Sequence, residues 1–172
     1  MIRSLTTLGA LAIAATAGTA LAQQQPQQPP ARGVEMSLAL EAAQAAVSTC
    51  LSQGVKGAAA VLDSAGVLRI LVSADGASTN ASVLSPKKGV AAIQMKKSSS
   101  EIQAEAEKDA ALKAKLEADK NIFPRAGAVL IKAGNDVVGA IAFGGANGQQ
   151  GGGTHDEACA KAGLDKISAR VK

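Results

Sequence analysis

A glycine-rich loop near the end of the chain separates an apolar run from an acidic helix start. Residues 144–153 contain six glycines, and so many conformationally free residues exclude a regular helix or strand there. The run before the loop, Asp136–Phe143, is apolar after its first residue and includes three β-branched residues, which predicts a strand. The segment after it, capped by Thr154 or Asp156, predicts a helix through Ile167. The remaining elements must therefore pack around this strand, loop and helix.

The N-terminus has the pattern of a secretory signal peptide. Arg3 supplies the positive charge, an apolar or small-residue segment follows, and Ala20–Ala22 presents the small-x-small sequence of a cleavage site. The apolar core is too short and too rich in alanine to favour a membrane anchor. We therefore expect residues 1–22 to be removed, leaving a periplasmic or secreted protein without membrane insertion.

The mature chain has the length of one domain. Residues 23–35 are rich in Gln and Pro and predict a disordered tether, so the domain is expected at 36–172. The net charge is only +4, and the chain has two Phe and no Trp or Tyr. Nucleic-acid binders combine stronger basic patches with stacking aromatic residues. Nucleic acid is therefore not expected as a partner.

Two hairpins and several helices account for the rest of the domain. Turn residues flanked by β-branched runs predict the hairpins, and apolar spacing predicts the first helix, capped by Ser37 and closed at Gly54. Ser85 followed by Pro86 predicts the start of a middle helix, and Glu101–Asp119 predicts one surface helix. Gly163 predicts a break or an early end in the last helix. The hairpin strands are expected at Ala58–Leu62, Val67–Val72, Ala128–Lys132 and Asp136–Phe143. This order indicates one antiparallel sheet faced by helices, an α+β fold.

The residues capable of chemistry are few. Cys50 and Cys159 lack the close spacing of a metal site, so one disulfide is favoured over free thiols in an exported protein. His155 is the only histidine; it is either an iron or metal ligand or an exposed residue of the helix start. Asp156 and Glu157 add carboxylates, but adjacent helical residues point in different directions. No pattern of covalent catalysis is present, and whether the protein is an enzyme stays open, with the balance against it.

Three segments together resemble the GlcG/HbpS family of haem-binding-like proteins. The segment Val61–Ala77 resembles the family's first hairpin, Val137–Ala146 its strand and loop, and Asp156–Gly163 its terminal helix. The resemblance implies a profilin-like three-layer α/β/α sandwich around a five-stranded antiparallel sheet, and homo-oligomers. It also implies that the first and last helices share one side of the sheet, which would bring Cys50 and Cys159 into bonding range.

The resemblance makes haem or a related tetrapyrrole the expected ligand, bound for carriage, sensing or protection. In that hypothesis His155 ligates the iron and the loop at Gly144 and Gly145 lets the flat macrocycle approach the backbone. The propionates would pair with basic side chains, for which the candidates are Lys87, Lys88 and Arg125. The alternative is a disulfide-linked oligomeric accessory protein that binds a partner protein without a cofactor. A small-molecule enzyme using the glycine-rich loop is a third possibility.

Overall fold

The computed structural model describes residues 31–146 and 152–172. The expected signal peptide and most of the expected tether lie outside these residues, as does the centre of the glycine-rich loop. The elements in chain order are α1 (Met36–Ser52), β1 (Ala58–Asp63), β2 (Leu68–Ser73), α2 (Thr79–Met95), α3 (Ser99–Lys108), α4 (Ala110–Ala118), β3 (Ala128–Ala133), β4 (Asp136–Gly144), α5 (Gly153–Ile167) and a short 3-10 turn, η1 (Ser168–Arg170). In the described part of the chain, no helix combines the length and apolar character needed to span a bilayer.

The sheet has four strands in the order β2-β1-β4-β3, with every neighbouring pair antiparallel. Both predicted hairpins are confirmed. In the first, the Asp63 side chain accepts hydrogen bonds from the N–H groups of Ala65 and Val67, each at 3.0 Å, and so closes the turn. The expectation of five strands is wrong for the described residues. The fifth strand followed only from the resemblance, and the segment between the hairpins is helical.

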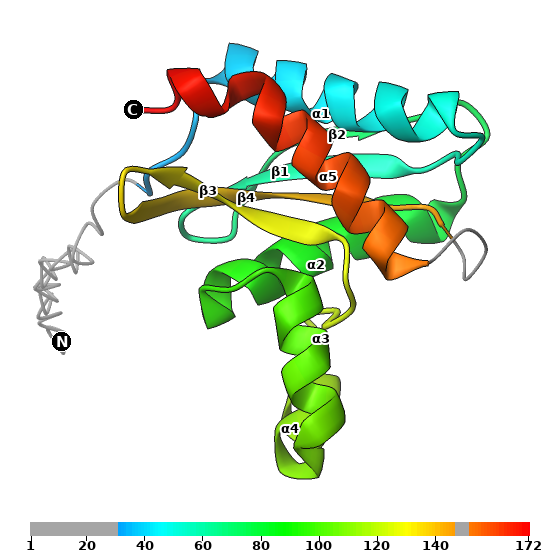
Figure 1. The fold of residues 1–172 in the computed structure, drawn as a ribbon, viewed down its shortest axis with the longest axis vertical. Coiled ribbons are helices and arrows are strands. Elements are labelled where there is room, and N and C mark those ends of the chain that lie inside the picture. Colours follow the sequence, from blue (N-terminus) through cyan, green and yellow to red (C-terminus); the bar gives the residue numbers. More distant parts are fainter. Residues whose placement is uncertain (1–30, 147–151) are drawn as a thin grey trace, which may run out of the picture.

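Helices cover both faces of this sheet, which makes a three-layer sandwich. Helices α1 and α5 lie side by side on one face, α2 lies on the other, and α3 and α4 project away from the sheet beyond α2 (Figure 1). The core on the α1 side combines small residues of the helices with larger side chains of the strands, among them Val61, Ile131, Ile141 and Phe143.

Small residues allow α1 and α5 to pack closely. The buried side of α1 is lined by alanines, namely Ala39, Ala42, Ala43 and Ala46. On the partner helix, a Cβ at Gly163 would lie 2.4 Å from the Ala42 carbonyl oxygen and 3.0 Å from the Ala46 Cβ. Gly163 therefore marks a close helix contact and does not break the helix, contrary to the expectation from sequence.

Two expected helix starts are wrong. Helix α1 begins after Glu35 without a side-chain cap, so Ser37 lies inside it. Helix α2 begins after Ser78, whose hydroxyl accepts a hydrogen bond from the Ala81 N–H, and Pro86 lies within the helix. One face of α2, buried from Ala81 to Ala92, packs on the sheet, and this burial outweighs the local cost of an internal proline.

The expected single helix at 101–119 is two helices. The backbone of Asp109 is extended, and its carboxylate accepts hydrogen bonds from the N–H groups of Ala111 and Leu112, which caps α4. This break lets α4 turn back so that Leu116 meets Ile102 in a small apolar cluster. This cluster, whose other buried members are Ala91, Ala106 and Ile122, stabilises α3 and α4 as a projecting arm.

Candidate functional site

The described ends of the glycine-rich loop border a cavity of about 420 Å³. One wall is the first half of α2, another is the turn of chain before β3, and the N-terminus of α5 closes a third side. Its lining residues are Asn80, Ala81, Leu84, Lys88, Gln103, Phe123, Arg125, Gly144, Gly145, Ala146, Gly152, Gly153 and Asp156. The lining mixes apolar walls with a few charged groups, as small-molecule sites do.

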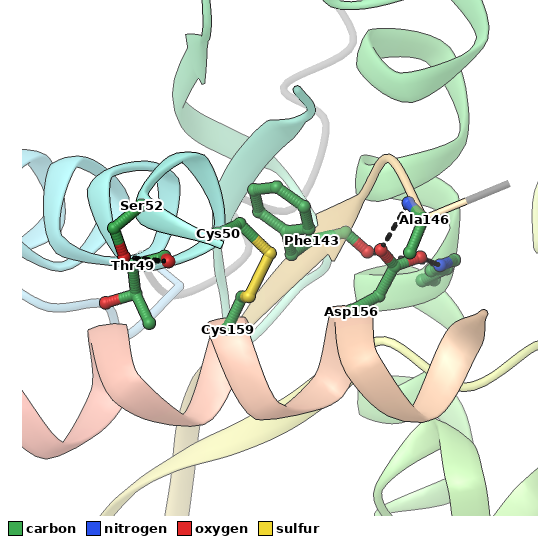
Figure 2. Close-up of a disulfide and its surroundings, with 8 residues drawn as sticks. Thr49, Cys50, Ser52, Phe143, Ala146, Asp156 and Cys159 are labelled. Carbon is green, nitrogen blue, oxygen red and sulfur yellow. Dashed lines mark hydrogen bonds and ion pairs between the residues drawn. A yellow bond between two sulfur atoms is a disulfide. The ribbon is translucent and has the colours of Figure 1, made fainter. Parts of the chain in front are cut away.

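A buried ion pair forms the floor of this cavity. The Lys88 Nζ lies 2.6 Å from an Asp156 carboxylate oxygen, and both side chains are almost fully buried, at 5% and 6% exposure. Lys88 also donates to the Phe143 carbonyl oxygen at 3.1 Å, while the second Asp156 oxygen accepts from the Ala146 N–H at 2.9 Å. Figure 2 shows these contacts around Asp156. The backbone groups that hydrogen-bond to the pair belong to Phe143 of β4 and to Ala146 of the loop after it. The pair therefore fixes where that loop begins.

Gly127 makes room for the lysine. Its φ is +136°, and a Cβ there would lie 2.5 Å from the Lys88 Nζ and 2.7 Å from the Phe143 carbonyl oxygen. The neighbouring Glu157 accepts hydrogen bonds from the backbone N–H and the hydroxyl of Ser100, at 3.0 Å and 2.6 Å. Adjacent acidic residues of α5 therefore connect it to two different helices, Asp156 to α2 and Glu157 to α3.

The arm reaches the cavity through Gln103 of α3. Its side-chain oxygen accepts a hydrogen bond from the Ala126 N–H at 2.9 Å. Nearby, the buried Ser99 hydroxyl accepts from the Ala128 N–H at 2.7 Å. These bonds hold the turn that carries Phe123 and Arg125 against the mouth of the cavity.

The structure gathers four of the six predicted binding residues around this cavity: Lys88, Arg125, Gly144 and Gly145. Lys87 is not among the lining residues; its Nζ donates to the Lys120 carbonyl oxygen at 2.9 Å and so holds the chain after α4. Lys88 is neutralised by Asp156, whereas Arg125 is exposed and forms no ion pair with any described residue. Arg125 and the N-terminus of α5 are therefore the positive features left for an anionic ligand.

His155 lies on the other side of α5, beside the disulfide. Cys50 and Cys159 are bonded, with their Cα atoms 5.6 Å apart, which confirms the predicted pairing. One ring nitrogen of His155 and the two sulfur atoms lie within 4.8 Å of one another. The His155 Nε2 is buried and has no hydrogen-bond partner among the residues that the structure describes. Figure 2 shows Phe143 close to the disulfide, on the side of α5 that faces α1.

Sequence reasoning missed several residues of the cavity. Thr154 or Asp156 was expected to cap α5, but Gly152 holds the cap position, and Asp156 is the partner of Lys88. Gln103 and Phe123 gave no signal, because they lie in a segment whose composition indicates only a surface helix and its end. The only available signal was the pair of carboxylates at the start of α5, since buried acidic residues require partners.

The fold and site define a single-domain α/β/α sandwich with a ligand-sized cavity at the N-terminus of its last helix. A family model described as haem degrading protein HbpS-like matches residues 34–165. The chain belongs to this HbpS-like family. No curated protein sequence gives a significant match.

Solved structures agree with this assignment at the level of the fold. A variant of HbpS from Streptomyces reticuli superposes with a TM-score of 0.70 at 23% identity, over 91% of this chain and 97% of that chain. The ORFY protein of Klebsiella pneumoniae gives 0.72 at 20% identity, over 84% and 97%. PduOC in its haem complex gives 0.69 at 19% identity, over 78% and 95%.

Proposed function

We propose that this protein binds haem or a related tetrapyrrole in the cavity at the start of α5. The observation that carries the proposal is the composition of the cavity: the unpaired Arg125 stands at a space walled by Leu84 and Phe123 and bordered by glycine backbone. Its volume of about 420 Å³ falls within the range of roughly 300–1,000 Å³ typical of ligand sites. The description of the family and the haem complex of PduOC support the same ligand class.

The cavity fits the periphery of a tetrapyrrole better than its iron. Arg125 would pair with a propionate, and the backbone of Gly144 and Gly145 would border the edge of the ring. Bound iron would supply its own redox and ligand chemistry, which the protein tunes through axial ligands and burial. The described lining residues include no histidine, methionine or tyrosine. In this geometry the cavity binds the macrocycle through its edge and faces.

Iron ligation by His155 stays a separate hypothesis. Its imidazole lies beside the disulfide, so the first turn of α5 would have to rearrange before the ring reached the cavity. If ligation by iron contributes to binding, haemin should bind more tightly than metal-free protoporphyrin. If only the periphery is recognised, the two should bind equally well.

A titration of the purified mature protein tests the proposal. We expect haemin to give a saturable Soret shift, and Arg125→Ala to weaken binding by about tenfold through loss of a charge-assisted hydrogen bond. Lys166→Ala is the matched control, because it removes an exposed cation near the far end of α5. His155→Phe decides whether the histidine is a ligand. No saturable shift in the wild-type protein would overturn the proposal.

A second candidate function, self-association or binding of a partner protein, is favoured by apolar side chains along an edge strand. Strand β2 ends the sheet, and Leu68 and Leu71 on it are 43% and 40% exposed, with Val67 before it at 56%. Exposed apolar edges favour association. Sedimentation of the wild-type protein and of Leu71→Lys tests this: a larger species that the variant loses supports an interface at β2.

Export stays a prediction of the N-terminal sequence. We propose a periplasmic or secreted location, which the disulfide supports because such bonds persist in oxidising compartments. N-terminal sequencing of the protein isolated from its host tests it. A first residue of Gln23 would support cleavage after Ala22, and an intact Met1 would contradict it.

A further inference from the structure

We propose that Cys50, Cys159 and His155 form a binding site for a thiophilic cation such as Zn²⁺ when the disulfide is reduced. The two sulfur atoms and one imidazole nitrogen already lie within 4.8 Å of one another. They come from two helices whose close packing is set by alanine and glycine, which favours keeping the three side chains together once the covalent bond is broken. This inference goes beyond tetrapyrrole binding and does not depend on it.

The ligand set matches the preference of such cations. Zinc takes thiolate sulfur at about 2.3 Å and imidazole nitrogen at about 2.0 Å, in tetrahedral geometry that separates two sulfurs by about 3.8 Å. The Cα atoms of the two cysteines are 5.6 Å apart, which leaves the sulfurs free to separate by side-chain rotation alone once the bond is broken. Three protein ligands leave one coordination position for water. Because the His155 side chain is only half-buried, water can reach the cation from that side.

The histidine supplies an independent observation. Its Nε2 is buried without a hydrogen-bond partner, and in the described residues only the Ser85 hydroxyl shares that condition. Buried polar atoms are almost always paired, because leaving one without a partner costs free energy. A cation held by the imidazole and the two thiolates would give the His155 side chain a binding partner. Cys50 and Cys159 are both fully buried, which shields the bonds from water.

A dithiol can reduce the Cys50–Cys159 disulfide. The dithiol transfers two electrons and two protons to the disulfide, which gives two protein thiols and the cyclic disulfide of the reductant. The divalent cation then replaces both thiol protons, forming two sulfur–metal bonds and releasing two protons to solvent. A chain that has not yet been oxidised after synthesis enters the second step directly.

The site is separate from the cavity although both use α5. His155 and Cys159 contact the α1 side, whereas Asp156 faces α2 and the cavity. Cation binding therefore does not require the tetrapyrrole, and failure of either proposal leaves the other standing.

Cobalt serves as the spectroscopic probe for zinc. The tag-free full-length chain is reduced with a phosphine, two thiols per chain are verified, and Co²⁺ is added without oxygen. We expect one Co²⁺ per reduced chain with a thiolate-to-cobalt charge-transfer band and tetrahedral visible bands, both removed by added Zn²⁺. The oxidised protein should show neither band. A reduced wild-type protein without the charge-transfer band would overturn the proposal.

His155→Phe tests the third ligand while retaining an aromatic ring. The variant should bind Co²⁺ at least about tenfold more weakly, since even supporting residues of metal sites contribute that much. Equal affinity in the two proteins would contradict the role of His155. If reduction unfolds the chain, Zn²⁺ should restore the far-UV circular dichroism of the wild type and raise its Tm above that of His155→Phe. No such recovery would equally overturn the proposal.

Discussion

The two sides of α5 are held by opposite kinds of interaction. Toward α1 the helix presents Cys159, Ala160 and Gly163, and the contact is apolar, closely packed and covalently linked. Toward α2 and α3 it presents Asp156 and Glu157, and the contact combines a buried ion pair with partly buried hydrogen bonds. One helix thus joins an apolar layer to the polar edge of the cavity.

This difference separates stability from ligand binding. The apolar side depends on shape and on a bond that salt and pH leave intact. The polar side depends on directional bonds that place the loop after β4 and the turn before β3. Burying charges contributes little net stability, and its best-supported role is to specify one arrangement. The polar side of α5, which fixes how α5 sits against α2 and α3, is also the side that borders the cavity.

Removal of the disulfide should have the largest effect on stability. Cys50 and Cys159 are 109 residues apart in sequence, so their bond restricts the unfolded chain strongly. We expect Cys50→Ala with Cys159→Ala to lower the free energy of unfolding by roughly 4–5 kcal/mol. Denaturant titration of the double variant beside the wild type measures this. A loss below about 1 kcal/mol would mean that the apolar packing alone holds the two helices together.

Breaking the buried ion pair should have a comparable but slightly smaller effect. Asp156→Asn leaves the Lys88 ammonium buried beside a neutral group and should cost roughly 3–5 kcal/mol. Lys88→Met combined with Asp156→Leu removes both charges and should recover most of that stability. If the double variant is no more stable than Asp156→Asn, hydrogen bonds to the Phe143 carbonyl and the Ala146 N–H carry more of the energy than the charge pair.

The features that could be predicted from the sequence are those set by local turn chemistry or by the residue types themselves. The hairpins follow from local turn chemistry, as at Asp63, whose carboxylate closes its own turn. The disulfide was already favoured by two cysteines in a chain expected to be exported, and the family resemblance implied the same pairing. The hairpins and the disulfide could therefore be predicted from the sequence, whereas the close contact at Gly163, on the same apolar side of α5, was mistaken for a helix break.

The polar side depends on contacts between distant segments. Lys88 and Asp156 are 68 residues apart, and a Lys-Lys pair normally indicates an exposed surface. The start of α2 was misplaced because Ser85 and Pro86 form a convincing local cap signal, while Ser78 takes that role. The break at Asp109 has the same origin: Ala, Glu and Lys favour helix on both sides, and the apolar cluster of the arm decides where the chain turns.

Enlarging Gly163 tests how closely the apolar side is packed. A Cβ at this position would meet the Ala42 carbonyl oxygen at 2.4 Å and the Ile141 Cδ1 at 2.7 Å. We expect Gly163→Ala to destabilise the protein by about 1–3 kcal/mol, as overpacking does elsewhere. Gly134→Ala is a useful comparison, because that turn glycine has positive φ but open space around it. A larger loss at Gly134 would mean that backbone strain outweighs the helix contact.

The smallest expected effect is at the start of α3, which the polar side of α5 holds in place. Ser98 and Glu101 form a capping box, and the hydrogen bond from the Ser98 N–H lowers the pKa of the Glu101 carboxyl, as does the Ser98 hydroxyl. We expect Ser98→Ala to cost about 1 kcal/mol.

The lowered pKa sets the pH dependence of this cap. A depressed carboxyl pKa contributes stability above the ordinary value of 4.5, and this contribution is lost as pH falls through the lower pKa of the folded state. The Tm difference between wild type and Glu101→Gln should therefore be present near neutral pH and shrink in acid, as the pH falls below the ordinary carboxyl value of 4.5. A difference that stays constant in acid would show that the Glu101 charge does not contribute. The cap would then depend on the Ser98 hydroxyl, and the carboxylates of α5 would remain the charges that position the arm.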